Sequence, residues 1–96
     1  MQAIAIFILD KTTTIIDANE YACRLTGYSR EELLGMKVVD FISPEELEKQ
    51  VLFFELLKKN MAPLSERRLR RKDGTTVDTE INARLLEDEG YISIGT

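Results

Sequence analysis

The chain contains no histidine and a single cysteine. The first absence excludes Ser-His-Asp and Cys-His arrangements for nucleophilic catalysis, and it excludes a phosphoacceptor histidine. One cysteine, Cys23, excludes an internal disulfide bond and is typical of a reducing compartment. Carboxylate pairs occur at Glu31-Glu32 and Glu45-Glu46, where they fall in predicted first helical turns and stabilise the helix dipole, and at Asp88-Glu89 in a predicted turn. We therefore expect neither an enzyme nor a metal site.

The chain also lacks a basic excess and a long apolar segment. The chain has 13 Lys and Arg residues and 17 Asp and Glu residues, which gives a net charge of −4. A nucleic-acid-binding domain, in contrast, needs a basic face. No apolar run approaches the roughly 20 residues of a membrane helix. The N-terminus lacks the basic start and cleavage site of a signal peptide. We predict one small cytoplasmic domain with a modest core, no nucleic-acid partner and no direct membrane contact.

Residues 19–35 predict two short capped helices. Asn19 can cap the first helix, and Gly27 can end it in the left-handed conformation that glycine adopts at low cost. Ser29 and Glu32 have the spacing of a capping box for the second helix, which Gly35 closes. Helices this short are unstable alone, so we expect them to pack on a larger element.

The remaining pattern predicts an α+β domain. Residues 3–9 form an isoleucine-rich run of strand length, and Ile15–Ala18 follows as a second strand. Residues 38–42 predict a helical turn. Ser43 and Pro44 begin the longest helix, which extends to about Asn60 with an apolar face at Leu47, Val51, Phe54 and Leu57. Three strands follow, the last at residues 91–96, so two strands, a helical middle and three strands make the order.

The loop at residues 72–74, Lys-Asp-Gly, allows two hairpin registers. A two-residue loop pairs Leu69 with Asp78, whereas a three-residue loop with Gly74 in the left-handed conformation pairs Leu69 with Val77. We favour the second, because register follows the apolar residues. It also places Arg68 opposite Asp78, where opposite charges are stabilising.

One basic cluster precedes this loop and allows two interpretations. It could bind phosphate or nucleic acid, or it could be a solvated strand with cross-strand ion pairs. Alternation sends its side chains to both faces, and acidic residues are adjacent, so we favour the solvated strand. If Arg67 points inward, it could instead anchor an anionic ligand. The cluster comprises Arg67, Arg68, Arg70, Arg71 and Lys72.

Several of these elements together resemble a PAS domain. The resemblance covers about residues 6–95 and rests on Asn-x-x-x-x-x-Leu-x-Gly-Tyr-Ser-x-Glu-Glu-Leu-Leu-Gly, Asp-Phe-Ile-Ser-Pro-Glu and Arg-Arg-Lys-Asp-Gly. It implies a PAS-like five-stranded antiparallel sheet of order 2-1-5-4-3, with short helices and one longer helix on one face. Family members usually carry glycine at the place of Thr13, so the geometry of that turn stays open.

The resemblance also implies a setting for the domain. PAS domains are sensory and dimerisation modules of larger signalling proteins, here of a bacterial or archaeal kind. We interpret residues 1–96 as a single PAS domain that ends before its linker to an effector domain. A sensor histidine kinase of a two-component system is our first hypothesis for the parent protein.

Two cofactors known in PAS domains are disfavoured by the residues present. Haem-binding members usually ligate iron through a histidine of the long helix, which this chain lacks. Light-sensing members attack flavin with a cysteine inside Asn-Cys-Arg-Phe-Leu-Gln, which the segment around Cys23 only partly matches. We interpret Cys23 and Tyr28 as packing residues and Asn19 as a helix cap. A small apolar ligand stays compatible with the sequence.

Two functional hypotheses remain. A sensory module would hold a ligand between the sheet and the long helix, although the same side chains could simply fill the core, which we favour. The predicted lining residues are Leu25, Phe41, Val51, Phe54, Ile81 and Ile94. The alternative is a dimerisation module without a ligand. Residues 3–9 are apolar throughout, and helices on one side cover only one face, so we predict a homodimer through the outer sheet face at Ala5, Phe7 and Leu9.

Overall fold

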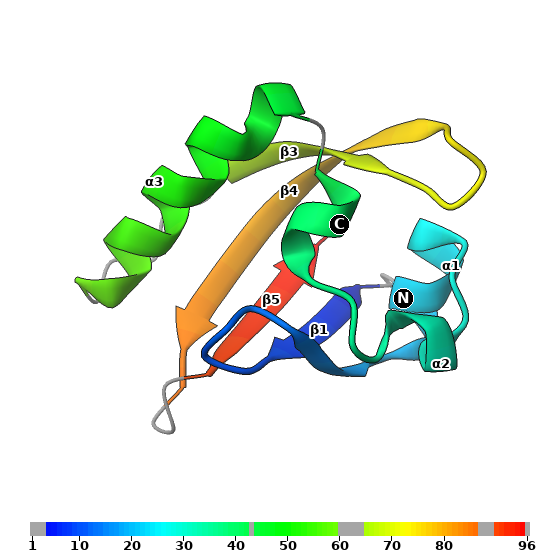
Figure 1. The fold of residues 1–96 in the computed structure, drawn as a ribbon, viewed down its shortest axis with the longest axis horizontal. Coiled ribbons are helices and arrows are strands. Elements are labelled where there is room, and N and C mark those ends of the chain that lie inside the picture. The colour runs from blue at the N-terminus through cyan, green and yellow to red at the C-terminus, as the bar shows by residue number, and fades with distance from the viewer. Residues whose placement is uncertain (1–3, 43, 60–64, 87–89, 96) are drawn as a thin grey trace.

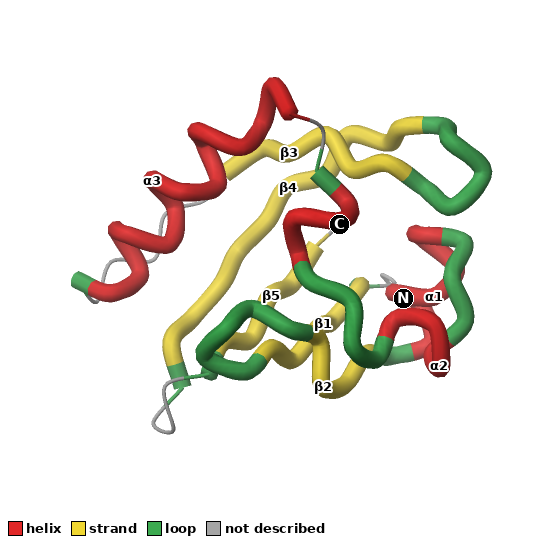
Figure 2. Tube along the Cα trace, viewed as in Figure 1, coloured by secondary structure: helices red, strands yellow, loops and turns green. Residues whose placement is uncertain are grey.

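The computed structural model describes residues 4–42, 44–59, 65–86 and 90–95. The predicted cap Ser43, the predicted helix end at Asn60 and the pair Asp88-Glu89 lie outside these ranges. The elements, shown in Figures 1 and 2, are β1 (Ala5–Leu9), β2 (Ile15–Ala18), α1 (Glu20–Thr26), α2 (Arg30–Leu33), the 3₁₀ turns η1 (Val38–Phe41) and η2 (Pro44–Glu46), α3 (Leu47–Lys58), β3 (Ser65–Arg70), β4 (Thr76–Leu85) and β5 (Tyr91–Gly95).

The strands form one five-stranded sheet in the order β2-β1-β5-β4-β3, which confirms the predicted topology. All four neighbouring pairs are antiparallel. Helices α1 and α2 pack against β1 and β2, whereas α3 packs against the other half of the sheet at β4 (Figure 1). No helix within the described ranges is long and apolar enough to cross a bilayer.

The β3–β4 hairpin has the predicted three-residue loop. Leu69 pairs with Val77 and Arg68 pairs with Asp78. Gly74 has a φ of 88°, in the left-handed region. Arg68 Nε lies 3.1 Å from Asp78 Oδ1. The apolar pattern therefore determined this register correctly.

The predicted caps of α1 and the capping box of α2 are confirmed, whereas the predicted start of the long helix at Pro44 is wrong, because α3 begins at Leu47 after the 3₁₀ turn η2. The side chain of Asn19 accepts a hydrogen bond from the Ala22 amide at 2.9 Å, and Gly27 ends α1 with a φ of 80°. Ser29 and Glu32 form a reciprocal capping box at the start of α2. Asn19 also bonds β1 through the Ile6 amide, at 3.0 Å, so this cap fixes α1 to the sheet.

The β1–β2 turn forms without the glycine usual in the family. Thr13 itself occupies the left-handed region with a φ of 65°. The carboxylate of Asp10 accepts hydrogen bonds from the amides of Thr12 and Thr14, at 2.8 and 3.1 Å. These bonds, together with one from the Thr12 hydroxyl at 2.6 Å, hold the turn in a conformation that is strained for a β-branched residue.

The predicted dimer residues of β1 are wrong, because they face the helices. Ala5 and Leu9 are almost fully buried in the core, and the ring of Phe7 packs against Phe41 with centroids 6.3 Å apart. Residues of a strand alternate between faces, but this run is apolar at every position. Its sequence therefore gives no signal for which half of the residues points inward.

Candidate functional site

The core between the sheet and the helices brings together three of the six predicted pocket residues. Leu25, Phe41 and Ile81 are buried and belong to one hydrophobic cluster. They come from α1, η1 and β4, which lie far apart in the sequence. These side chains pack against other core residues.

Helix α3 presents a different face to the sheet from the predicted one. Val51 is 62% exposed, so its assignment to the pocket is wrong. Phe54 is half-buried and contacts the ring of Phe53, with centroids 6.2 Å apart. The buried residues of α3 are Gln50, Phe53 and Leu57. Because its apolar residues span a wide arc, periodicity alone did not locate this face, and the inward glutamine gave no apolar signal.

The sixth predicted residue, Ile94, lies in the central strand β5. By register it pairs with Ile6 of β1 on one side and with Asn82 of β4 on the other. Its side chain lies outside the part of the structure that is described. Its role in a pocket therefore stays a prediction.

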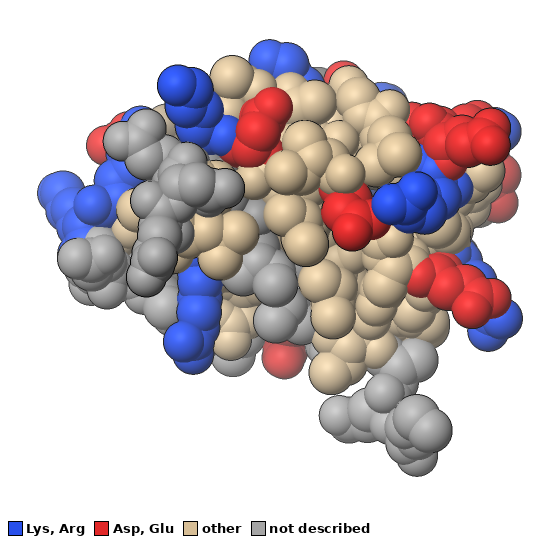
Figure 3. Space-filling view, turned by 90° about the horizontal axis from the view of Figure 1, so that it is seen from below, with Lys and Arg blue, Asp and Glu red and all other residues tan. Residues whose placement is uncertain are grey.

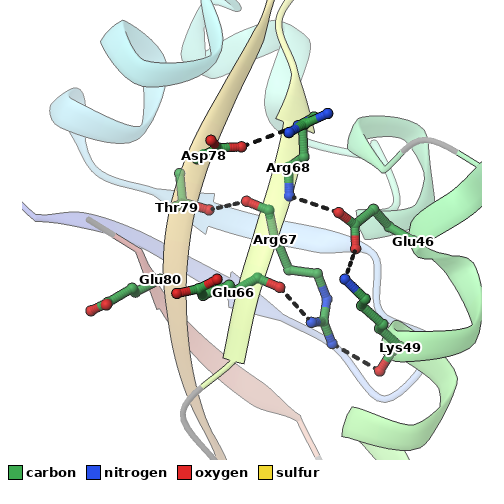
Figure 4. Close-up of a pocket in the computed structure, with 8 residues that line it drawn as sticks. All are labelled: Glu46, Lys49, Glu66, Arg67, Arg68, Asp78, Thr79 and Glu80. Atoms are coloured by element: carbon green, nitrogen blue, oxygen red, sulfur yellow. Dashed lines mark hydrogen bonds and ion pairs between the residues drawn. The ribbon is translucent and has the colours of Figure 1, made fainter.

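The space under the N-terminal half of α3 is occupied by Arg67 of β3, which is only 2% exposed. Its guanidinium donates to the carbonyl of Lys49 in α3 at 2.8 Å (Figure 4). In the same helix, it donates to the side-chain oxygen of Gln50 at 3.0 Å. It also donates to the carbonyl of Glu66 at 2.8 Å and to the hydroxyl of Ser65. The sequence allowed an inward Arg67 as an alternative, but it gave no signal that Gln50 is its partner.

The charge of Arg67 is balanced indirectly. Burial lowers the pKa of its guanidinium, and the negative charge of Glu46 opposes this shift. The guanidinium carbon also lies 5.3 Å from the ring centroid of Phe53, which gives a cation–π contact. Arginine keeps its charge at neutral pH. The buried Arg67 cation is therefore stabilised mainly by carbonyl oxygens, an amide oxygen and an aromatic ring.

Glu46 forms a second connection between α3 and β3. Its Oε1 accepts a hydrogen bond from the Arg68 backbone amide at 3.3 Å, on the edge strand of the sheet. Its Oε2 lies 3.4 Å from Lys49 Nζ, and this buried oxygen accepts no hydrogen bond in the described part of the chain. The N-terminal end of α3 is thus attached to β3 through polar contacts.

A groove of about 360 Å³ lies beside these contacts, and its lining residues are labelled in Figure 4. They carry both signs of charge, and none of them is a cysteine or a histidine. Among the described residues, no three potential metal ligands of the His, Cys, Asp and Glu types are grouped closely enough to hold an ion. The arrangement can hold polar groups and position α3. The lining comprises Glu46, Lys49, Glu66, Arg67, Arg68, Asp78, Thr79 and Glu80.

The basic cluster of β3 does not form a continuous patch. Arg67 is buried, Arg68 pairs with Asp78, and Arg70 is exposed. Arg71 and Lys72 contact the end of α1 through hydrogen bonds to backbone carbonyls. On the face seen in Figure 3, uncharged side chains cover most of the described surface, and charged ones of both signs are scattered over it and along its edges. Arg68 therefore fits a solvated strand with cross-strand ion pairs better than a phosphate-binding or nucleic-acid-binding patch.

Two other residues weighed from the sequence have packing roles. Cys23 is half-buried and packs against the core. The ring of Tyr28 meets Phe41 edge to face, with centroids 5.7 Å apart, and Lys72 Nζ lies 5.9 Å from its centroid. Both observations fit the packing interpretation.

Comparison with known proteins agrees with the fold and the local motifs. A family model described as PAS domain matches residues 3–96. This chain belongs to the PAS domain family.

Two solved structures illustrate the relationship. The PAS domain of a protein from Colwellia psychrerythraea has a TM-score of 0.88 and 25% identity, covering 97% of this chain and 84% of that one. A PAS domain from a two-component sensor histidine kinase has a TM-score of 0.77 and 27% identity, covering 96% of this chain and 80% of that one.

A curated relative matches a shorter segment. The PAS domain-containing serine/threonine-protein kinase of Mus musculus is 44% identical over 45 residues, which is 46% of this chain. The matched segment spans 3% of that protein's length. The family match over residues 3–96 makes this a PAS sensory domain, whereas the comparison with the whole kinase extends no further than the 45 matched residues.

Proposed function

We propose that this PAS domain is the cytoplasmic sensory and signal-transduction module of a multidomain regulatory protein, a sensor histidine kinase, and that it catalyses no reaction. The similarity to a PAS domain from a two-component sensor histidine kinase supports this setting. The absence of histidine in the sequence fits a module that leaves phosphotransfer to another domain.

The observation that carries the proposal is the polar attachment of α3 to the sheet. A signal can act only by having different affinities for two conformations of the domain. Arg67 and Glu46 attach α3 to β3 through directional contacts, while Val51 and Leu52 on the helix are 62% and 61% exposed. Directional polar contacts are made or lost as units, so this helix is well suited to alternate between two positions.

The input is a ligand or a partner that favours one position of α3. Three of the predicted pocket residues belong to the same buried cluster as Phe53 and Leu57 of α3: Leu25, Phe41 and Ile81. A small apolar ligand at this boundary would compete with the packing of α3 and so change its position. Haem and flavin are not part of the proposal.

The test uses the full-length protein and Arg67→Met, with Arg70→Met as the control. Arg70 is exposed on the same strand, so its replacement removes the same charge without touching α3. We expect Arg67→Met to change the basal output of the effector domain and Arg70→Met to leave it unchanged. Unchanged output in a folded Arg67→Met protein would refute the role of this contact in signalling.

The second candidate, a dimerisation module, is favoured by the outer face of β1. Ile4 is 37% exposed, and Ile6 and Ile8, which alternate with the inward residues, are half-buried. Ile16 of the neighbouring strand is 53% exposed. An apolar outer face of this kind is suited to a second copy of the domain.

Sedimentation velocity on Ile6→Lys tests this candidate, with Thr76→Lys as the control. Thr76 is exposed on β4 at the hairpin end, away from β1. If the outer face forms a homodimer, Ile6→Lys is monomeric at concentrations where the wild type and Thr76→Lys are dimeric. A wild type that remains monomeric at high micromolar concentration excludes this dimer.

A further inference from the structure

The tip of the β3–β4 hairpin is attached to the C-terminal end of α1. The Lys72 amide donates to the Thr26 carbonyl at 2.9 Å, and Arg71 Nε donates to the Leu25 carbonyl at 3.1 Å. A Cβ atom placed on Gly27 would lie 3.6 Å from Lys72 Cβ, so the two segments approach closely. The helix end and the hairpin tip therefore form the two walls of one cleft.

This cleft has a volume of about 500 Å³ and a positive lining in an acidic protein. Its charged residues are Arg24, Arg71, Lys72 and Asp73, three cations and one anion, which gives a formal charge of +2 against −4 for the whole chain. One oxygen of the Asp73 carboxylate already accepts hydrogen bonds from the Thr75 amide and hydroxyl, at 2.9 and 2.6 Å. These hydrogen bonds and the charge of Arg71 lower the pKa of the Asp73 carboxyl, so it stays charged and offsets one of the three cations.

Arg71 has guanidinium hydrogen-bond donors that bond to none of the described residues. Its side chain is half-buried, and only its Nε has a hydrogen bond among the described residues, so its two terminal nitrogens can donate to a ligand. The bond to Leu25 fixes the direction of the guanidinium in advance. A planar guanidinium held in this way suits the two-point recognition of an oxyanion.

The other two cations are held by exchangeable partners. Arg24 pairs with Glu20 at 2.8 Å, and Lys72 pairs with Glu32 at 2.6 Å. All four side chains are at least 41% exposed, and exposed pairs of this kind contribute little stability. Either cation can therefore turn to an incoming anion at low cost.

We propose that this cleft binds a phosphate group, with Arg71 as its anchor and with Arg24 and Lys72 supplying further positive charge. Once Arg24 and Lys72 turn from Glu20 and Glu32 to the ligand, the lining supplies a net charge of +2, which matches a dianion. The C-terminal end of α1 would repel an anion, but Arg71 and Lys72 already bond two of its carbonyls. This inference is independent of the sensory role proposed above, because it does not require α3 to move.

The phosphate group could belong to a simple phosphate compound or to a nucleotide, and two probes distinguish these sources. Inorganic pyrophosphate and ADP are titrated separately into the domain while the amide resonances of Gly27, Lys72 and Gly74 are followed by NMR. Similar affinities would show that the phosphate group alone is recognised. A clearly higher affinity for ADP would favour a nucleotide. Both results support the proposal.

Arg71→Gln is the test variant, and Arg70→Gln is its matched control. Arg70 is the preceding residue, is exposed and does not line the cleft. For a site with a dissociation constant of about 1 mM or lower, we expect Arg71→Gln to weaken binding about tenfold or more and Arg70→Gln to have little effect. If Arg71→Gln does not fold, Arg71→Lys keeps the charge but loses the fork of donors, and we expect intermediate weakening.

Two results would overturn the proposal. In the first, neither probe shifts the three amide resonances. In the second, Arg70→Gln weakens binding as much as the Arg71 variant does, because the attraction would then come from the general charge of the hairpin and no specific cleft would be involved.

Discussion

Replacing Arg67 with methionine removes the polar attachment of α3 while keeping an unbranched side chain that fills similar space. The guanidinium has four hydrogen-bond acceptors: Gln50, the Lys49 and Glu66 carbonyls, and Ser65. Glu66 is exposed and Ser65 half-buried, so water can replace the arginine there. Gln50 is only 5% exposed and would be left without its partner.

The cost follows mainly from this orphaned glutamine. A buried polar group that loses its partner costs about 1–3 kcal/mol, and the charged arginine itself was costly to bury. We therefore expect Arg67→Met to lower the free energy of unfolding by about 2 kcal/mol. In the double variant Arg67→Met/Gln50→Leu both partners are apolar, and we expect a loss below about 1 kcal/mol.

Urea denaturation of the four proteins of this double-mutant cycle measures the coupling. Arg70→Met is the control, because this exposed residue should change stability by no more than about 0.5 kcal/mol. A single variant Arg67→Met as stable as the control would show that the bonds of the buried guanidinium do not stabilise the domain. A double variant that loses the sum of the two single losses would contradict the predicted coupling, because the two side chains would then be independent.

Three further predictions concern the turns. Thr13→Gly should stabilise the domain by about 0.5–1 kcal/mol in urea denaturation, because glycine adopts a positive φ without the strain of a β-branched residue. The higher entropy of the unfolded chain limits this gain, and no gain at all would show that Thr13 is not strained. Gly74→Ala should destabilise the domain by about 1–2 kcal/mol in the same assay, because alanine would be strained at the positive φ of this position. Hydrogen bonds from Thr12 and Thr14 lower the pKa of the Asp10 carboxyl below its ordinary value of 3.8, so the folded state binds this proton less readily than the unfolded state. The resulting stability is present above the ordinary pKa and is lost as pH falls through the folded pKa. Asp10→Asn should therefore reduce the loss of unfolding free energy between about pH 2 and pH 5, and an unchanged loss in this variant would contradict the prediction.

Local signals in the sequence were sufficient for the caps of α1 and α2 and for the hairpin register. Asn19 and Ser29 act through neighbours three residues away, and Gly74 acts within its own turn. Such features depend on short-range chemistry that the sequence displays directly. The order of the five strands came from the family resemblance and needed no side-chain detail.

The inward faces of β1 and α3 could not be predicted in the same way. Every residue of β1 is apolar, so alternation carries no information about which side is buried. In α3, the buried face includes the polar Gln50 because Arg67 reaches it from a strand 17 residues away. A pairing between distant polar residues leaves no periodic trace in either segment. Apolar periodicity instead favoured Val51, which is exposed.

If α3 alternates between two positions, it opens from the sheet while the strands stay folded. Native-state hydrogen exchange measures the opening free energy of α3 amides and of β1 and β5 amides in the same protein. Such independent opening of α3 predicts a lower opening free energy across residues 47–58 in the wild type, lowered further by Arg67→Met, with the strands exchanging only through global unfolding. Equal opening free energies in helix and strands, in both proteins, would contradict it.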